Sequence, residues 1–255
     1  MKVAVVGCGA IGGEVVRAAS AMEGIEEVWI HDIDPDATRL LARLPKVHVA
    51  KNASEAIGKA RLLIEAANKG VVQTAVREAL AAGKGAMLMT VGALADDALR
   101  ADLLHLATST GGKIYIPSGA VMGVDGVKAA AAGDLKSVTL VTTKPPAGLK
   151  SESDRWTLLF SGPAREAIEK FPKNVNVAAT LSLAGLGFDK THVQVAMDPL
   201  ATRNSHKLII EGNFGRARIE VENLPSPTNP ATSYMASLSA IALLKRIVSP
   251  IEIGA

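Results

Sequence analysis

Three glycines near the start of the chain are spaced as a phosphate-binding turn requires. The segment Gly7-Cys8-Gly9-Ala10-Ile11-Gly12 follows an apolar run over 3–6 and leads into a helix-forming segment. In such a turn the first glycine permits the tight bend, the second admits a pyrophosphate close to the backbone, and the third lets the helix pack on the strand. The amides at the helix start, including those of Ala10 and Ile11, and the helix dipole then hold the phosphates. The spacing predicts that this segment binds a dinucleotide.

An acidic residue follows at the distance this motif needs. Asp32 ends the second apolar run, about 20 residues after the turn, where a carboxylate accepts hydrogen bonds from ribose hydroxyls. Asp34 adds a second negative charge, and the next cation along the chain is Arg39. A 2′-phosphate would meet two carboxylates, so we predict NAD as the cofactor, with NADP disfavoured. Asp34 is also expected to cap a helix that begins at Pro35.

Two histidines in the second half could move the proton that accompanies a hydride transfer. His206 follows a polar loop at the entry to a predicted strand, a junction where catalytic groups are often positioned. The alternative is a half-buried histidine whose role is structural. His192 shares a strand face with Gln194 and is expected on the polar face of a sheet. We expect both imidazoles to be partly solvated.

Cys8 is a poor candidate for a nucleophile, because it lies inside the phosphate turn, away from the reacting end of a dinucleotide. This argues against thiohemiacetal chemistry, which needs a cysteine beside the substrate. The chain has one cysteine, so no internal disulfide forms, as is usual in a reducing cytoplasm. No His, Cys, Asp or Glu cluster has metal-ligand spacing, and we predict no metal site.

The first half alternates strands and helices. Strands are predicted at 2–6, 27–32, 46–49, 61–66, 86–91 and 113–116, with helices near 10–22, 36–43, 53–60, 70–82 and 95–110. Apolar strands separated by helices form a parallel sheet covered on both faces. The fold class is therefore α/β, with a doubly wound, Rossmann-type dinucleotide-binding domain over residues 1–116.

A smaller α/β catalytic domain is predicted over residues 117–229. Helices are expected at 124–132, 163–170 and 175–185, and strands at 136–143, 190–197, 205–211 and 215–222, in a mixed, largely antiparallel sheet. We predict a last helix over 230–248, with Asn229 as its N-cap and Pro230 as its first residue. Its apolar stripe, Leu238, Ile241, Leu244 and Val248, is expected to pack back on the first domain.

Net charge and hydropathy argue against a nucleic-acid-binding protein and against a membrane-spanning one. The 255 residues carry a net charge of +3, with the basic residues spread along the chain, so a nucleic-acid-binding face is not indicated. No apolar run is long enough to span a bilayer, and the first strand begins too early to leave room for a signal peptide. We expect a cytoplasmic protein.

Several segments of the second half resemble the L-aspartate dehydrogenase family, and the resemblance extends over nearly the whole chain. They are Ser118-Gly119-Ala120, Thr143-Lys144-Pro145-Pro146, Lys173-Asn174-Val175-Asn176-Val177-Ala178-Ala179-Thr180, Asp198-Pro199 with Asn204 and His206, and Glu222-Asn223-Leu224-Pro225-Ser226-Pro227-Thr228-Asn229-Pro230. The third and the last are far more specific than the glycine motif.

The resemblance implies oxidation of L-aspartate with NAD(P) to iminosuccinate, which hydrolyses to oxaloacetate and ammonia or supplies NAD biosynthesis. It implies a homodimer, and it implies that His206 is the active-site histidine, with cofactor contacts at Ala120 and Asn176 near the nicotinamide. Asn204 is a candidate substrate contact. The two substrate carboxylates need cations or aligned amides; Lys144, Arg203, Lys207 and Arg216 are the candidates, and the sequence does not rank them.

Two other readings remain open. One is a different small two-domain NAD(P)-dependent oxidoreductase, similar to dihydrodipicolinate reductase or homoserine dehydrogenase. The other is a non-catalytic NAD sensor, which would need no proton-handling histidine in its second domain.

Overall fold

The computed structural model describes residues 1–146, 154–171, 176–227 and 229–253. It divides into two compact units, 1–117 with 237–252, and 118–236 with 253–255. Parts of two segments that carry the family resemblance, residues 173–175 and residue 228, lie outside the described residues.

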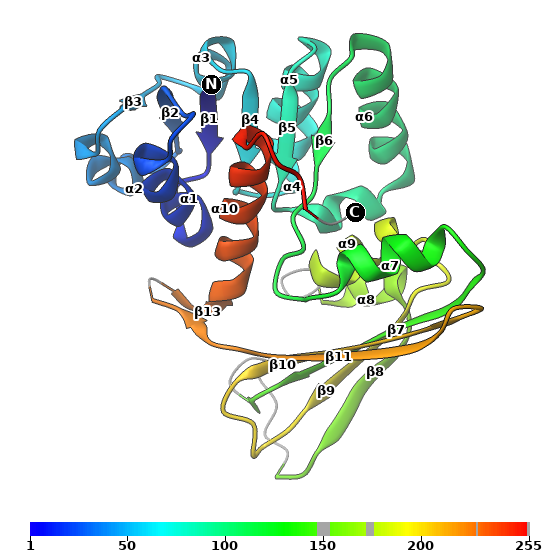
Figure 1. Ribbon diagram of the computed structural model, residues 1–255. Coiled ribbons are helices and arrows are strands. Elements are labelled where there is room, and N and C mark those ends of the chain that lie inside the picture. Colours follow the sequence, from blue (N-terminus) through cyan, green and yellow to red (C-terminus); the bar gives the residue numbers. More distant parts are fainter. Residues whose placement is uncertain (147–153, 172–175, 228, 254–255) are drawn as a thin grey trace. The chain divides into compact units, whose positions relative to one another are not determined.

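The first unit is built on a parallel six-stranded sheet with the order β3-β2-β1-β4-β5-β6 (Figure 1). Its strands are β1 (Lys2–Val6), β2 (Glu27–His31), β3 (Val47–Val49), β4 (Leu62–Glu65), β5 (Gly85–Leu88) and β6 (Ile114–Tyr115). Its helices are α1 (Ala10–Ala21), α2 (Pro35–Arg39), α3 (Ala53–Lys59), α4 (Lys69–Val71), α5 (Arg77–Ala81) and α6 (Asp97–Thr110). Short turns of 3-10 or π type lie at Leu41–Arg43, Val72–Val76 and Val91–Ala95. The doubly wound parallel domain predicted from the alternating pattern is confirmed.

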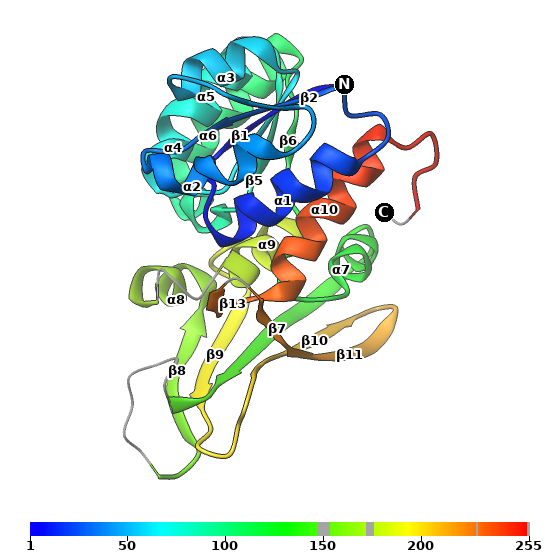
Figure 2. The same ribbon diagram turned by 90° about the vertical axis from the view of Figure 1, so that its left-hand side faces the viewer.

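Helices cover both faces of this sheet (Figure 2). On one face α1 and α10 (Tyr234–Val248) pack on the strands, and one buried cluster joins Val16 of α1, Ile30 of β2, Ile64 of β4 and Leu244 of α10. On the other face lie α3, α5 and α6. Of the stripe predicted for the last helix, Leu238 is the exception at 38% exposed, because the buried side follows the 3.6-residue period through Ser237, Ala240 and Leu244.

The second unit has a mixed five-stranded sheet with the order β11-β10-β7-β9-β8, in which only the β7–β9 pair is parallel. Its strands are β7 (Leu135–Lys144), β8 (Thr157–Pro163), β9 (His192–Met197), β10 (Asn204–Gly212) and β11 (Gly215–Asn223). The helices α7 (Val124–Ala131), α8 (Ala164–Lys170) and α9 (Asn176–Ala184) lie along one face (Figure 1). The mixed, largely antiparallel sheet predicted from the sequence is confirmed.

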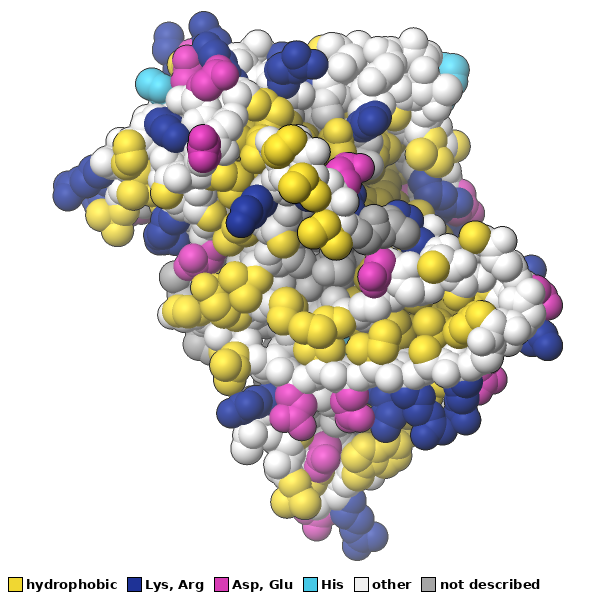
Figure 3. Space-filling view, viewed as in Figure 1, with side chains coloured by type: hydrophobic (Ala, Val, Ile, Leu, Met, Phe, Trp, Pro, Cys, Tyr) yellow, Lys and Arg dark blue, Asp and Glu magenta, His cyan; other side chains and the backbone are white. Residues whose placement is uncertain are grey.

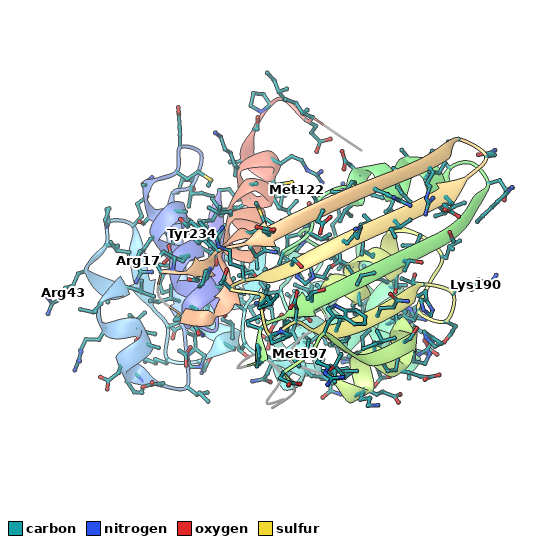
Figure 4. The ribbon with its side chains drawn as sticks, turned by 90° about the horizontal axis from the view of Figure 1, so that it is seen from below. Arg17, Arg43, Met122, Lys190, Met197 and Tyr234 are labelled. Atoms are coloured by element: carbon teal, nitrogen blue, oxygen red, sulfur yellow. The ribbon has the colours of Figure 1, made fainter. Side chains whose placement is uncertain are left out.

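Strand residues of this sheet alternate between two environments. Val138, Leu140 and Thr142 of β7 and Leu208 of β10 are buried on the face that the helices cover. Figure 4 views the unit from below, and side chains of the strands project from the opposite face. On β11 that alternation leaves Arg216, Arg218, Glu220 and Glu222 exposed, and charged side chains gather over β10 and β11 in Figure 3.

One prediction about local structure is wrong, and one strand of the second sheet was not predicted. The last helix does not begin at Pro230: residues Asn229–Ser233 form β13, which pairs with β12 (Pro225–Ser226), and α10 begins at Tyr234. Proline lacks an amide hydrogen and is tolerated near the start of a strand. The strand β8 is absent from the prediction, because a bulge between Leu158 and Phe160 breaks its alternation.

Candidate functional site

The glycine turn joins β1 to α1 as the spacing predicts. Gly7 has a φ of +93°, a left-handed conformation that other residues rarely adopt, and its amide donates to the His31 carbonyl at 3.0 Å. Gly9 is the N-cap of α1 without a side-chain cap, and the first helical hydrogen bond runs from the Gly13 amide to the Gly9 carbonyl at 2.7 Å. The amides of the first helical residues, Ala10 to Gly12, precede that bond and are therefore available to an anion.

The three glycines differ in the space around them. A Cβ on Gly7 would lie 2.5 Å from the Ala66 oxygen, and a Cβ on Gly12 would collide with the Gly7 carbonyl oxygen. A Cβ on Gly9 would meet nothing within 4 Å. The turn is thus packed tightly on the protein side and open at Gly9, a cradle that fits a pyrophosphate.

The Asp32 carboxylate joins the glycine turn to the loop after β2. Its Oδ2 accepts from the Cys8 amide at 2.6 Å, and its Oδ1 accepts from the Asp34 amide at 2.9 Å. A carboxylate has about four acceptor positions, so both oxygens retain capacity for ribose hydroxyls. Asp34 is exposed and caps α2, accepting from the Asp36 amide at 2.9 Å, as predicted.

The Cys8 thiol is unsuited to nucleophilic chemistry. It is 5% exposed, and burial, together with the nearby Asp32 charge, raises its pKa to about 12. A thiol with that pKa is protonated at neutral pH and is a weak nucleophile.

In the second unit, His206 lies at the end of the helix-covered face of the sheet. It pairs across β10 and β7 with Thr142, whose Oγ1 lies 3.1 Å from His206 Nδ1. Lys144 is the next residue of β7 on the same face, 7% exposed. It pairs with Met197, which Figure 4 labels at the end of β9. An imidazole, a hydroxyl and an ammonium are thus gathered on one buried face.

His206 is only 4% exposed, so the expectation of a partly solvated imidazole is wrong. It is the third residue of β10 and points inward, as the alternation of Leu208 and Ile210 on the same strand requires. Burial, and then the positive charge of Lys144, lower its pKa from 6.5 to about 4. Burial likewise lowers the pKa of Lys144. The resting imidazole is therefore neutral at physiological pH.

Of the four candidate cations for substrate carboxylates, Lys144 shares the face of His206. Lys207 is on the opposite face of β10 and pairs with Glu220 at 3.4 Å. Arg216 pairs with Glu211 at 2.8 Å near the far end of the hairpin, and Arg203 is exposed just before β10. Position on the sheet thus ranks candidates that the sequence left equal.

The other predicted contacts in this unit lie on neighbouring loops. The Ala120 carbonyl accepts from Asn223 Nδ2 at 3.1 Å, and Asn223 pairs with Asn204 across β11 and β10. A Cβ on Gly119 would lie 3.8 Å from Val177, so the 118–120 loop lies against the start of α9, where Asn176 is the exposed first residue.

Asn223 is a residue that sequence reasoning did not single out. It is 4% exposed, and among the described residues its Oδ1 has no hydrogen-bond partner. Thr142 was missed as well; the alternation of β7 and the pairing with β10 were needed to find it.

His192 lies on the opposite face of the sheet from His206. It pairs with Thr139 of β7, and its Nε2 lies 3.0 Å from Ser161 Oγ. Val193 and Val195 of the same strand are buried on the helix-covered face, whereas His192 is half-buried. The structure does not bring His192 and His206 together.

One cavity of about 960 Å³ lies at the amino ends of the parallel strands of the first unit. Lys2, Arg61, Lys84 and Lys113 are among its lining residues. Nucleotides bind outside the carboxyl ends of such strands, where Gly7 and Asp32 lie, so this cavity is separate from the predicted nucleotide site.

In the described ranges no three His, Cys, Asp or Glu side chains are grouped so as to hold a metal ion. Within those same ranges, no helix has the length and apolarity needed to cross a bilayer.

Comparison with known proteins gives consistent matches to both halves of the chain. Residues 125–247 match the family model "Aspartate dehydrogenase, C-terminal", and residues 7–117 match "Homoserine dehydrogenase, NAD binding domain". The L-aspartate dehydrogenase of Methanosarcina barkeri is 44% identical over 271 residues, covering 100% of this chain and 99% of the relative. That of Methanothermobacter thermautotrophicus is 39% identical over 256 residues, covering 100% and 98%.

Solved structures share the fold. The crystal structure of aspartate dehydrogenase from Thermotoga maritima has a TM-score of 0.83 at 24% identity, covering 100% of this chain and 99% of that chain. A scyllo-inositol dehydrogenase from Lactobacillus casei has a TM-score of 0.62 at 14% identity, covering 100% and 90%.

The lowered pKa of His206 makes stability depend on pH. The unfolded chain binds a proton at this residue near pH 6.5 and the folded chain only near pH 4, so folding is disfavoured progressively as the pH falls through that window. Between pH 7 and pH 5 the free energy of unfolding should fall by about 2 kcal/mol more in the wild type than in His206→Leu. Urea denaturation at both pH values measures this difference.

Leu208→Ala provides the control, because it lies on the same strand and face and removes no titratable group. It should lower stability equally at both pH values. An equal fall for wild type and His206→Leu would contradict the assigned pKa shift.

Proposed function

Because the chain belongs to the L-aspartate dehydrogenase family and is an oxidoreductase of that family, we propose that it oxidises L-aspartate with NAD to iminosuccinate. Cα loses a hydride with its electron pair, and the nitrogen loses a proton to give the imine. Water then adds to the imine carbon, and the adduct collapses to oxaloacetate and ammonia. Iminosuccinate that leaves before hydrolysis would supply NAD biosynthesis.

The observation that carries this proposal is the buried group formed by His206, Thr142 and Lys144. A neutral imidazole can accept a proton, and the 3.1 Å contact with Thr142 Oγ1 fixes the orientation of the ring. Lys144 on the same face supplies a positive charge for a substrate carboxylate. The pairing of an acid–base group with a carboxylate-binding cation suits an acidic amino acid.

Substrate binding would also adjust the basicity of His206. Burial is the main cause of its low pKa, and the Lys144 charge adds to it. A carboxylate placed against Lys144 cancels that charge at His206, so the imidazole pKa rises toward neutrality when substrate is present. This rise would favour proton transfer in the occupied site.

The remaining site residues are assigned by the family resemblance together with their positions. Gly7, Gly9, Ala10, Ile11 and Gly12 would hold the pyrophosphate and Asp32 the adenosine ribose. Ala120 and Asn176 would contact the nicotinamide end, and Asn204, on the face of His206, would contact the substrate. The bound dinucleotide supplies the hydride acceptor.

A spectrophotometric assay tests the activity directly. NADH absorbance should rise with L-aspartate, and it should fall with oxaloacetate plus ammonia. Values of kcat/KM should be much lower for L-glutamate, D-aspartate and L-homoserine. Comparable turnover of L-glutamate would contradict the substrate assignment, and no turnover with any of these compounds would favour an NAD sensor.

Replacement of His206 tests the acid–base role. His206→Ala should lower kcat by roughly 10²–10⁴-fold, the usual contribution of a positioned acid–base group. The Kd for NADH should change little, because this residue is assigned to the reacting carbon. Because His206 is buried, the fraction of folded protein must be measured by denaturation in the same buffer.

His192→Ala is the matched control. Its imidazole lies on the opposite face of the same sheet, so kcat should stay within about threefold of wild type. If His192→Ala were inactive and His206→Ala active, the assignment of the catalytic histidine would be wrong.

We also propose that NAD binds more tightly than NADP. The Asp32 carboxylate accepts hydrogen bonds from two backbone amides, which fix its position. The exposed carboxylate of Asp34 is nearby on the same loop. A 2′-phosphate would be repelled by both charges. Asp32→Ser combined with Asp34→Arg should reverse the ratio of Kd values for NADH and NADPH, measured by fluorescence titration. Equal wild-type affinities for the two cofactors would contradict this account.

A homodimer and a cytoplasmic location complete the proposal. β11 is an edge strand of its sheet and exposes Arg218 and Glu222, so two copies related by a two-fold axis would place Arg218 of each copy near Glu222 of the other. Light scattering measures the mass. The cytoplasmic location follows from the resemblance and the single cysteine, Cys8.

A further inference from the structure

Glu65 is a fully buried carboxylate at the carboxyl end of β4. Its exposed fraction is 0%, and the residues before it in β4 are Leu62, Leu63 and Ile64. Burying a carboxylate is costly unless it is paired or hydrogen-bonded. Within the described ranges Glu65 forms no ion pair, and its burial raises its pKa while hydrogen bonds act in the opposite direction. An apolar side chain at this position would avoid the free-energy cost of burying a carboxylate.

Three donors from two loops surround the carboxylate. Oε1 accepts from the Ala67 amide at 2.8 Å and from Thr90 Oγ1 at 2.7 Å, and Oε2 accepts from the Thr90 amide at 3.0 Å. Ala67 belongs to the loop after β4 and Thr90 to the loop after β5, the neighbouring parallel strand. One side chain therefore ties together two loops at the carboxyl edge of the sheet.

The first of these loops forms the wall behind the glycine turn. The Ala66 amide donates to the Val6 carbonyl at 2.9 Å, directly before Gly7. A Cβ on Gly7 would lie 2.5 Å from the Ala66 oxygen and 2.9 Å from the Ala67 Cβ. Because this contact leaves no space, a shift of the 66–67 backbone must move Gly7 or open a gap beside it.

We propose that Glu65 is a positioning residue for the dinucleotide: it holds the 66–67 loop so that Gly7 carries the phosphate turn in its binding-competent position. It acts through Ala66 and Ala67 and makes no contact with the nucleotide. The proposal rests on nicotinamide nucleotide binding by this family and is independent of which amino acid is oxidised.

Glutamine is the informative substitution, because its side chain has nearly the same shape as that of glutamate but carries an NH₂ donor in place of one carboxylate oxygen. The three groups around Glu65 all donate, which suits an acceptor-only carboxylate. An amide group places NH₂ against at least one of these donors, in either orientation, so at least one hydrogen bond is lost and two donors face each other.

The experiment measures NADH binding by fluorescence titration without substrate. Glu65→Gln should raise the Kd about tenfold, because nucleotide binding must then restore the loop position that the lost hydrogen bond to a charged group had held in the free protein. The value of kcat at saturating NAD should stay within about threefold, so the defect should appear in the KM for NAD. Hydrogen exchange at the Ala67 and Thr90 amides should accelerate in the same variant.

Thr90 provides a second and gentler test. Thr90→Val removes the hydroxyl that donates to Oε1 and should raise the Kd several-fold, whereas Thr90→Ser keeps the hydroxyl and should stay within about twofold of wild type. This pair decides the matter if Glu65→Gln does not fold.

Leu103→Ala controls for a general loss of stability. Leu103 is fully buried in α6 and has no assigned part in binding, so its truncation should lower the melting temperature and leave the Kd for NADH unchanged. The proposal is overturned if Glu65→Gln binds NADH within twofold of wild type, if Leu103→Ala weakens binding equally, or if Thr90→Val and Thr90→Ser bind alike. Absence of L-aspartate turnover in the wild type would contradict the proposed function, but it would not change the conclusion about Glu65 and NADH binding.

Discussion

The close approach of the Gly7 carbonyl to the Cα of Gly12 is the constraint on which the nucleotide-binding unit depends. It fixes where β1 ends, how sharply the chain turns and where α1 begins. Any side chain at Gly12 would push α1 away from the sheet, and the cluster that α1 shares with β2, β4 and α10 would lose its packing. Gly9 of the same turn is open toward solvent, so this tight packing is compatible with the proposal that the turn holds the phosphates.

Buried or half-buried carboxylates then hold the loops around that turn. Asp32 bonds to the Cys8 and Asp34 amides, and Glu65 bonds to Ala67 and Thr90. Each carboxylate connects segments that follow different strands, so the carboxyl edge of the sheet is joined by side chains as well as by the backbone ladder. Ionised acceptors make stronger hydrogen bonds than neutral ones, which suits loops that must keep their shape when empty.

In the second unit, ionisable groups lie on a face of the sheet that is otherwise apolar. Val138, Leu140 and Leu208 fill most of the helix-covered side of the sheet, and the polar group of Thr142, Lys144 and His206 lies at its end. Low solvent exposure lowers the pKa of both His206 and Lys144. A site of this kind responds strongly to an incoming carboxylate, because charges interact more strongly where water is excluded.

The sequence by itself determined the parallel strand–helix alternation, the glycine turn and the acidic residue at the end of β2, because each depends on local spacing and backbone conformation. It also carried the family resemblance. It did not give the burial of His206, the ranking of Lys144 over Lys207 and Arg216, or the start of α10 at Tyr234. Those depend on which strands pair and in which register. Asn229 and Pro230 belong to a strand because β13 pairs with β12, with Asn229 opposite Ser226 and Ser233 opposite Pro225. The role of Glu65 also depends on the tertiary structure, because Thr90, which donates a hydrogen bond to it, comes close only when β4 and β5 pair in the sheet.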